Sequence, residues 1–130
     1  MIACYAASDK TKLPINTINL SIQSIASMGL NAKAVENITE EDILDAATDP
    51  VVDVFKNSGF TNIDVSMEPV TVLGEKHSSL YITADIENYG KLYEREIVII
   101  KNGYASCFTV SDIGSDSDTT KDLLGYVEKY

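Results

Sequence analysis

The feature of this sequence that most constrains its fold is a β-hairpin predicted around Asn102 and Gly103. A two-residue type I′ turn requires a positive φ angle at both central residues, and Asn followed by Gly meets this requirement best. The segments on either side, Tyr93–Ile100 and Tyr104–Val110, are rich in β-branched and aromatic residues, which is typical of strands. The chain is therefore expected to contain at least one antiparallel pair of strands.

The register of this hairpin predicts that both of its faces are buried. If Lys101 lies opposite Tyr104, successive side chains alternate between the two faces of the sheet. One face then carries Ile97, Ile99, Tyr104, Phe108 and Val110, and the other carries Val98, Ile100, Ala105 and Cys107. A hairpin with one face in water would alternate apolar and polar residues, so this hairpin is predicted to lie in the middle of a sheet that is covered on both sides. The charged segment 94–96 is expected to lie nearer to solvent.

The rest of the chain predicts four more strands and two helices. The strands are expected at residues 2–7, 15–25, 62–73 and 79–87, and the helices at 39–57 and from 117 or 118 to 130. Segment 15–25 also fits a helical spacing of apolar residues, but its content of Thr, Asn and Ser favours a strand. The sequence therefore predicts a single α+β domain over residues 1–130, built on an antiparallel sheet of about six strands.

Three short signals make local predictions within these elements. Thr39 followed by Asp42 resembles a capping box, which marks the start of a helix. Pro50 is favoured as the first residue of a second helical piece, so a break or a kink is expected at Thr48–Asp49. Pro69 cannot donate a hydrogen bond to a neighbouring strand, so strand 62–73 is expected at an edge of the sheet or to carry a bulge.

The charge balance limits the classes of partner. Twenty acidic residues stand against ten basic ones, which gives a net charge of −10 at pH 7. Nucleic acid and anionic membrane surfaces both require a basic footprint, so neither is expected as a partner. The sequence also lacks an apolar run long enough to span a membrane, so membrane insertion of this chain is not expected. An acidic surface serves solubility, and a cation or a basic partner is the more specific alternative.

The N-terminus and the cysteines are weakly informative about location. Residues 1–4 lack the charged and hydrophobic regions of a signal peptide, although Ile2, Ala3 and Cys4 resemble the end of a bacterial lipobox. Without the preceding hydrophobic segment, a strand cysteine is the simpler interpretation of Cys4. Two cysteines permit one disulfide but do not imply it, and Cys107 is expected to be a small buried hydrophobe.

An acidic loop is the best candidate for a metal site. Asp112, Asp116 and Asp118 lie at alternate positions around Gly114, and carboxylate oxygens in a loop of this kind suit Ca²⁺. The loop departs from the EF-hand pattern, because its glycine is misplaced and Leu123 stands where a glutamate is required. Aspartates ahead of a helix also serve as turn and cap residues, which is the alternative. No cofactor is predicted.

Catalytic patterns are not visible in the sequence. The single histidine, His77, is expected to be exposed in a turn, with no nucleophile and no orienting acid beside it. One histidine and two distant cysteines make a zinc site improbable, and phosphate-binding glycine motifs are absent. Glu94 and Glu96 share a strand face, but their neighbours along the chain offer no apolar pocket, so they are expected to be surface charges.

Three tyrosines suggest a binding patch. Tyr81, Tyr89 and Tyr93 are expected to gather near the turn at residues 88–91. Tyrosine is enriched at protein interfaces, so this patch is a candidate for contacts with a partner or ligand. Strand faces also use tyrosine for ordinary packing, which is the alternative.

Some short motifs resemble those of a known fold family. They are the helix ending in Asn57–Phe60, the strand Val70–Glu75, and the spacing of aromatic and β-branched residues in Tyr93–Ile99 and Tyr104–Val110. Together with the order of elements, they resemble the PsbP-like fold used in secreted lipoproteins of Gram-positive bacteria. The resemblance implies an α/β/α sandwich with helices on both faces of the sheet, an extracytoplasmic location and a non-enzymatic binding or accessory role. No site residues can be transferred from it.

The sequence therefore supports three hypotheses about function. The first is a non-catalytic extracytoplasmic module, from a bacterial lipoprotein, that binds an unidentified protein or small ligand. The second is a small enzyme whose site is assembled from residues dispersed along the chain. The third is a homodimer formed through an open edge of the sheet.

Overall fold

The protein folds around an antiparallel sheet. The computed structural model describes residues 4–7, 14–29 and 32–127, and these contain six strands in the order β1-β2-β6-β5-β4-β3. The strands are β1 (Cys4–Ala7), β2 (Ile15–Ser24), β3 (Thr61–Val72), β4 (Glu75–Ile86), β5 (Gly90–Lys101) and β6 (Tyr104–Ile113). The predicted α+β class with an antiparallel sheet is confirmed, and β5 and β6 lie in its middle as expected.

The hairpin of β5 and β6 has the predicted turn and register. Asn102 and Gly103 have φ angles of 52° and 77°, as a type I′ turn requires. Lys101 pairs with Tyr104, and the pairing continues without a shift to Leu92 opposite Ile113. Local turn chemistry therefore fixes which residues of β5 and β6 point to each face of the sheet.

The described residues also form a short 3₁₀ helix and three α-helices. These are η1 (Ile25–Met28), α1 (Ala32–Asn37), α2 (Glu40–Asn57) and α3 (Thr120–Val127). The sequence did not predict η1 or α1. The last helix begins at Thr120, slightly after the expected start at about 117 or 118, because the Asp118 carboxylate accepts a hydrogen bond from the backbone N–H of Thr120 and so precedes the helix. Its expected end at 130 lies outside the described residues. None of the helices described is both long and apolar enough to cross a membrane.

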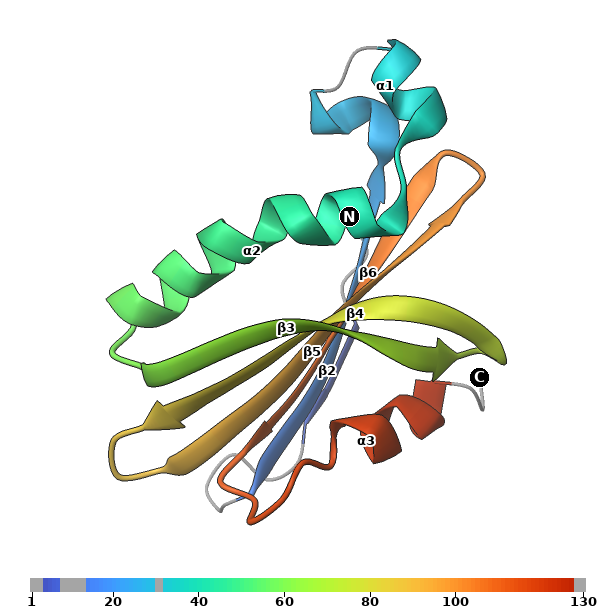
Figure 1. Ribbon diagram of the computed structural model, residues 1–130. Coiled ribbons are helices and arrows are strands. Elements are labelled where there is room, and N and C mark those ends of the chain that lie inside the picture. The colour runs from blue at the N-terminus through green and yellow to red at the C-terminus, as the bar shows by residue number, and fades with distance from the viewer. Residues whose placement is uncertain (1–3, 8–13, 30–31, 128–130) are drawn as a thin grey trace.

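Two hydrophobic cores lie on opposite sides of the sheet. Val98 of β5 packs in a cluster with Leu44 of α2, whereas its neighbour Ile97 packs in a second cluster with Leu124 of α3. Because adjacent residues of a strand point to opposite faces, α2 and α3 cover different faces of the sheet (Figure 1).

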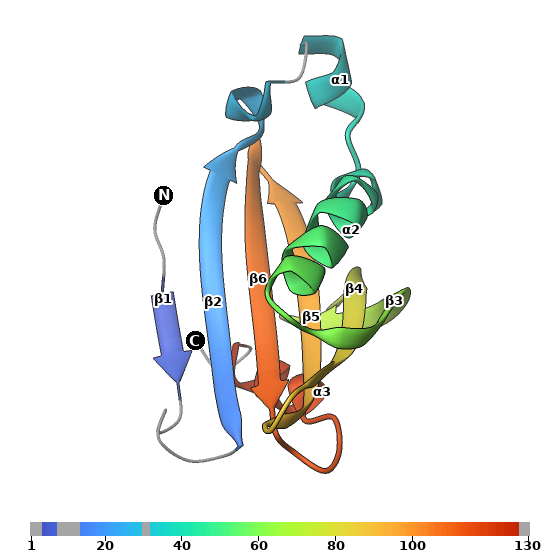
Figure 2. The same ribbon diagram turned by 90° about the vertical axis from the view of Figure 1, so that its left-hand side faces the viewer.

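The helix layers cover only part of the sheet. Helix α2 contacts β3, β4 and β5, and α3 contacts β3, β5 and β6. Figure 2 shows β1 and β2 at the other edge of the sheet, with neither α2 nor α3 lying across them. The predicted sandwich is therefore matched only in outline, and the α2 face of the sheet is partly open beside the helix.

Helix α2 begins where the sequence predicted and continues where it did not. The Thr39 hydroxyl accepts from the N–H of Asp42 at 3.1 Å, and the Asp42 carboxylate accepts from the N–H of Thr39 at 2.9 Å, which completes a capping box. The expected break at Thr48–Asp49 is wrong, because α2 runs unbroken through Pro50. Apolar residues on both sides of Pro50 pack on the same core, and this burial offsets the one backbone hydrogen bond that proline removes.

We expect the change Thr39→Ala to lower the free energy of unfolding by about 1 kcal/mol, because it removes the hydroxyl that accepts from the N–H of Asp42, while the bond from the backbone N–H of residue 39 to Asp42 remains. Thr39→Ser keeps the hydroxyl and is expected to stay close to the unchanged protein. Urea denaturation followed by circular dichroism measures both variants. An equal loss of stability in both variants would contradict the role of the cap.

The edge position predicted for the strand with Pro69 is confirmed. Strand β3 is the last strand of the sheet and pairs with β4 only. Pro69 lies opposite Ser78 in this pairing, and the register shift lies elsewhere, between Thr61 and Asp64. The proline therefore sits where no further strand needs its missing N–H.

Candidate functional site

The candidate site is a groove between α2 and the middle of the sheet. Glu94 and Glu96 lie two residues apart on β5, so both side chains point to the α2 face. They line a cavity of about 210 Å³, whose other wall is formed by apolar residues of α2. These α2 residues are Pro50, Val51, Val54 and Phe55. The cavity thus combines two carboxylates with an apolar wall, and we call it the acidic groove.

The strands beside β5 place the two carboxylates between unlike neighbours. On the β4 side, Glu94 pairs with Ile82 and Glu96 pairs with Leu80, and both partners are fully buried. On the β6 side, the Ser111 hydroxyl donates to Glu94 Oε2 at 2.5 Å. The carboxylates therefore meet apolar side chains on one side and a hydroxyl on the other.

Burial in the acidic groove changes the protonation of both carboxylates. Loss of hydration raises the pKa of Glu94, although the hydrogen bond from Ser111 opposes this shift. Loss of hydration raises the pKa of Glu96 to about 7, and the negative charge of Glu94 adds to the rise. Near neutral pH, Glu96 therefore changes readily between its charged and neutral forms.

The expectation that Glu94 and Glu96 are surface charges is wrong. Their immediate neighbours along the strand point to the other face of the sheet, and the apolar surroundings come from β4 and from α2, which are distant in the sequence. One signal was present in the sequence: strand alternation places both residues on the same face as Val98 and Ile100, which belong to a hydrophobic core.

Arg95 also departs from expectation, because it is 2% exposed on the opposite face of β5. Its Nε donates to Thr120 Oγ1 at 2.9 Å, and its Nη1 donates to Glu68 Oε2 at 3.0 Å. Nη1 also donates to Ser79 Oγ at 3.2 Å, and Nη2 donates to Asp118 Oδ2 at 3.3 Å. This guanidinium therefore joins β3, β4 and the start of α3 through one buried polar network.

The three tyrosines of the predicted patch lie in different surroundings. The Tyr81 ring lies 4.0 Å from the Arg95 guanidinium, and burial together with a hydrogen bond to Asp118 raises the pKa of Tyr81 to about 12. Tyr89 is exposed in the turn between β4 and β5, whereas Tyr93 is half-buried opposite Asp112. The structure therefore gives Tyr81 a contact with Arg95, and the binding patch of the three tyrosines stays a prediction.

The aspartates of the predicted calcium site do not converge. Asp112 is buried at the end of β6, where its carboxylate accepts hydrogen bonds from the hydroxyls of Ser115 and Thr119. Asp118 precedes α3 and binds Arg95, and Asp116 is exposed. Among residues 4–7, 14–29 and 32–127, no group of three or more acidic, histidine or cysteine side chains could hold a metal ion. The turn-and-cap alternative describes Asp112 and Asp118 better.

His77 is not the exposed turn histidine that the sequence suggested. It lies within β4, its side chain is 7% exposed, and its Nδ1 is 2.8 Å from Glu40 Oε2 at the start of α2. The neighbouring Ser78 hydroxyl donates to Glu41 Oε1 at 2.7 Å. Both contacts attach the first turn of α2 to β4. His77 and Ser78 each bind a glutamate of α2, so they do not form a pair of base and nucleophile.

Known proteins resemble this chain in fold, but no match shows its family. No family model and no curated protein matches this sequence. Among solved structures, LpqN of Mycobacterium tuberculosis, a protein involved in cell envelope biogenesis, is similar with a TM-score of 0.54 and 13% identity. The match covers 98% of this chain and 68% of LpqN. PA94 of Pseudomonas aeruginosa, a protein of unknown function, gives a TM-score of 0.48 and 9% identity over 96% of this chain and 76% of that one. At these identities the similarity to LpqN concerns the fold.

Proposed function

We propose that this chain is a non-catalytic binding module and that its ligand occupies the acidic groove. The observation that carries the proposal is an apolar helix wall facing two half-buried carboxylates. Val54 on this wall is 61% exposed and lines the cavity together with the two carboxylates. A ligand that covered Val54 would bury this apolar surface.

The ligand that fits this groove carries a positive charge and an apolar segment. Among the described residues, neither Glu94 nor Glu96 forms an ion pair, so the charges of the groove are not neutralised by the protein. An ammonium or guanidinium group would supply the missing charge, while an alkyl group would lie against Val54 and Phe55. An alkylamine or a basic side chain of a partner protein has this chemistry.

We also infer an extracytoplasmic location in a bacterial lipoprotein, and one PsbP-like domain over residues 1–130. The fold similarity to LpqN, which is involved in cell envelope biogenesis, supports the envelope location. The antiparallel sheet with α2 and α3 on its faces supports the PsbP-like assignment. These inferences can be tested by fractionating native cells and following the protein with an antibody; recovery in the cytoplasmic fraction would refute the location.

The binding proposal is tested by titrating the protein with n-hexylamine and following backbone amide shifts by NMR. We expect the amine to shift the amides around Glu94 and Val54, and to bind at least about tenfold more weakly to the double variant Glu94→Gln/Glu96→Gln. Hexanol and hexanoate, which lack the positive charge, are expected to bind more weakly than the amine.

The matched control for this test is Glu87→Gln. Glu87 is exposed in the turn between β4 and β5, so this variant removes one negative charge without changing the groove. An equal loss of amine affinity in Glu87→Gln would show that only the net charge of the protein matters. Equal binding of hexanol and hexylamine would likewise refute the role of the carboxylates.

A catalytic function is the second candidate, and the protonation of Glu96 favours it. A carboxyl group with a pKa of about 7 is suited to proton transfer at neutral pH. If the groove is catalytic, a panel of chromogenic esters and glycosides will show turnover whose pH dependence has an inflection near 7, and Glu96→Gln will abolish it. Such turnover would refute the non-catalytic proposal.

A further inference from the structure

A second pocket lies on the other side of the sheet, between α3 and the edge hairpin of β3 and β4. Its volume is about 410 Å³, which is within the usual range for small-molecule sites. Val70 of β3 and Leu124 of α3 form an apolar base and are 5% and 2% exposed. The rest of the lining is Pro69, Thr71, Lys76 and Lys121, all of which are exposed to solvent. The pocket therefore has an apolar base and a rim with two lysines.

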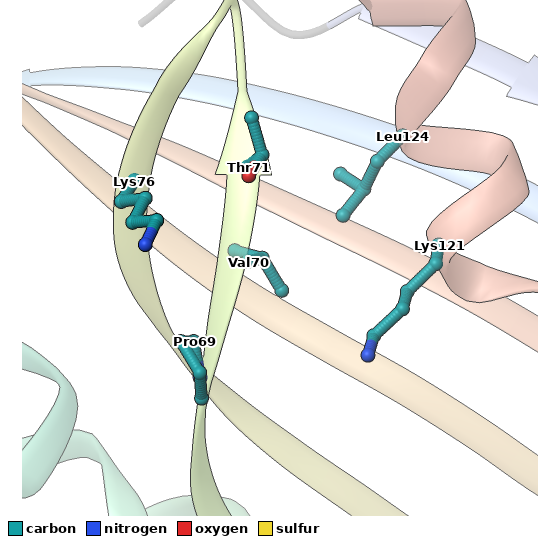
Figure 3. Close-up of a pocket in the computed structure, with 6 residues that line it drawn as sticks. All are labelled: Pro69, Val70, Thr71, Lys76, Lys121 and Leu124. Carbon is teal, nitrogen blue, oxygen red and sulfur yellow. The ribbon is translucent and has the colours of Figure 1, made fainter.

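The two lysines approach this pocket from different elements. Lys76 belongs to β4 and Lys121 to the first turn of α3, and in Figure 3 the ends of their side chains lie on either side of Val70. Neither amine forms an ion pair with a residue in the described part of the chain. The pocket thus has two lysine amines without an ion pair beside one apolar surface.

Several of the nearby carboxylates already have partners within the protein. Glu68 precedes Pro69 in β3, and Asp118 precedes α3, yet both bind the buried guanidinium of Arg95. Lys76 also lines a cavity with Glu40 and Glu41, but these two carboxylates accept hydrogen bonds from or contact His77 and Ser78. A ligand at this rim would have to supply the negative charge itself.

We propose that this pocket binds a small amphipathic anion, with a phosphate or carboxylate group between Lys76 and Lys121 and an aliphatic chain over Val70 and Leu124. Lysine amines bind such anionic groups as point charges, and the apolar base stabilises the chain by excluding water. The apolar base of the pocket lies on the opposite face of the sheet from the acidic groove, and the two cavities share no lining residue, so the two sites take ligands of opposite charge independently.

The test is an NMR titration with n-octyl phosphate and with octanoate, both kept below the concentrations at which they form micelles. We expect octyl phosphate to shift the backbone amides of Val70, Thr71 and Lys121. The double variant Lys76→Gln/Lys121→Gln is expected to weaken this binding at least about tenfold. The affinities for octyl phosphate and octanoate are compared to find whether the pocket prefers a phosphate or a carboxylate group. Binding of either anion supports the proposal.

Two further variants separate the rim from general effects of charge. Lys101→Gln removes one exposed positive charge at the distant turn between β5 and β6 and is expected to leave the affinity unchanged. Thr71→Glu places a negative charge on the rim at an exposed position of an edge strand, and is expected to abolish binding without loss of the fold.

Three outcomes would overturn the proposal. The first is equal binding of octyl glucoside, which is neutral, because the lysines would then have no role. The second is equal binding of inorganic phosphate and octyl phosphate, because the apolar base would then have no role. The third is an equal loss of affinity in Lys101→Gln and in the double lysine variant. The Glu94→Gln/Glu96→Gln variant should bind octyl phosphate normally, which separates this site from the acidic groove.

Discussion

Replacing Arg95 with alanine is expected to lower the free energy of unfolding by about 3 kcal/mol or more. The guanidinium is 2% exposed and donates to four side chains, so its removal leaves two carboxylates and two hydroxyls without their common partner. Glu68 and Asp118 retain some contact with water, which keeps the expected loss near the lower end of the range for buried ion pairs. Urea denaturation followed by circular dichroism measures the change.

Arg95→Lys is expected to recover only part of this stability. A single ammonium group cannot reproduce the planar set of donors that reaches Thr120, Glu68 and Asp118 at once. The amides of α3 should lose protection from hydrogen exchange first, because the network attaches the start of this helix to the sheet. A loss spread evenly over the whole sheet would argue against this anchoring role.

The matched control is Lys91→Ala, which removes a surface ion pair. Lys91 Nζ lies 3.9 Å from Asp85 Oδ1, and the two side chains are 48% and 41% exposed. Exposed pairs of this kind contribute about 0–1 kcal/mol. If Arg95→Ala cost no more than Lys91→Ala, the buried network would not be a determinant of stability.

The hairpin could be predicted from the sequence because its determinants are local. Asn102 and Gly103 fix the turn, and the turn fixes the register, so every cross-strand pair from Lys101 to Arg95 follows by counting. The capping box at the start of α2 is local in the same sense, since its two residues are three positions apart.

The acidic groove could not be predicted, because its apolar half is supplied by a distant helix. Glu94 and Glu96 look like surface residues until α2 crosses β5. The sequence predicted that residues 50–57 are helical, so the helical state of Val54 and Phe55 was expected. The packing of this helix across β5 could not be predicted, because it depends on contacts between segments that are distant in the sequence.

Strand β5 connects the two faces of the protein through simple alternation. Its even-numbered residues 94 and 96 face α2, while Arg95 between them faces α3. The three charges could not share one face without forming ion pairs with one another. Because of this alternation, Arg95 binds the polar network beneath α3, and the two glutamates of the groove remain without an ion pair.

Replacing Glu96 with glutamine is expected to stabilise the protein at about pH 8 and to have little effect at about pH 4. The folded-state pKa of Glu96 is about 7, above its ordinary value of 4.5, so the folded protein holds a proton that the unfolded chain has already lost. Below the pKa of 4.5 that Glu96 has in the unfolded chain, Glu96 is protonated in both the folded and the unfolded state, so it does not lower the free energy of unfolding. As the pH rises from 4.5 to about 7, the free energy of unfolding falls. Above about 7, Glu96 is charged in both states and the loss stays constant.

Glutamine resembles the protonated carboxyl group at every pH, so Glu96→Gln should remove this pH dependence. We expect a gain of about 1–2 kcal/mol at pH 8, smaller than the full shift implies because water reaches the groove and screens the charge. Urea denaturation at a series of pH values measures the gain, with Glu87→Gln as the exposed control. Equal behaviour of the two variants would show that Glu96 is not held in an apolar site. A gain confined to Glu96→Gln would mean that the free groove retains a costly negative charge, and that a cationic ligand which neutralises it should bind more tightly as the pH rises through 7.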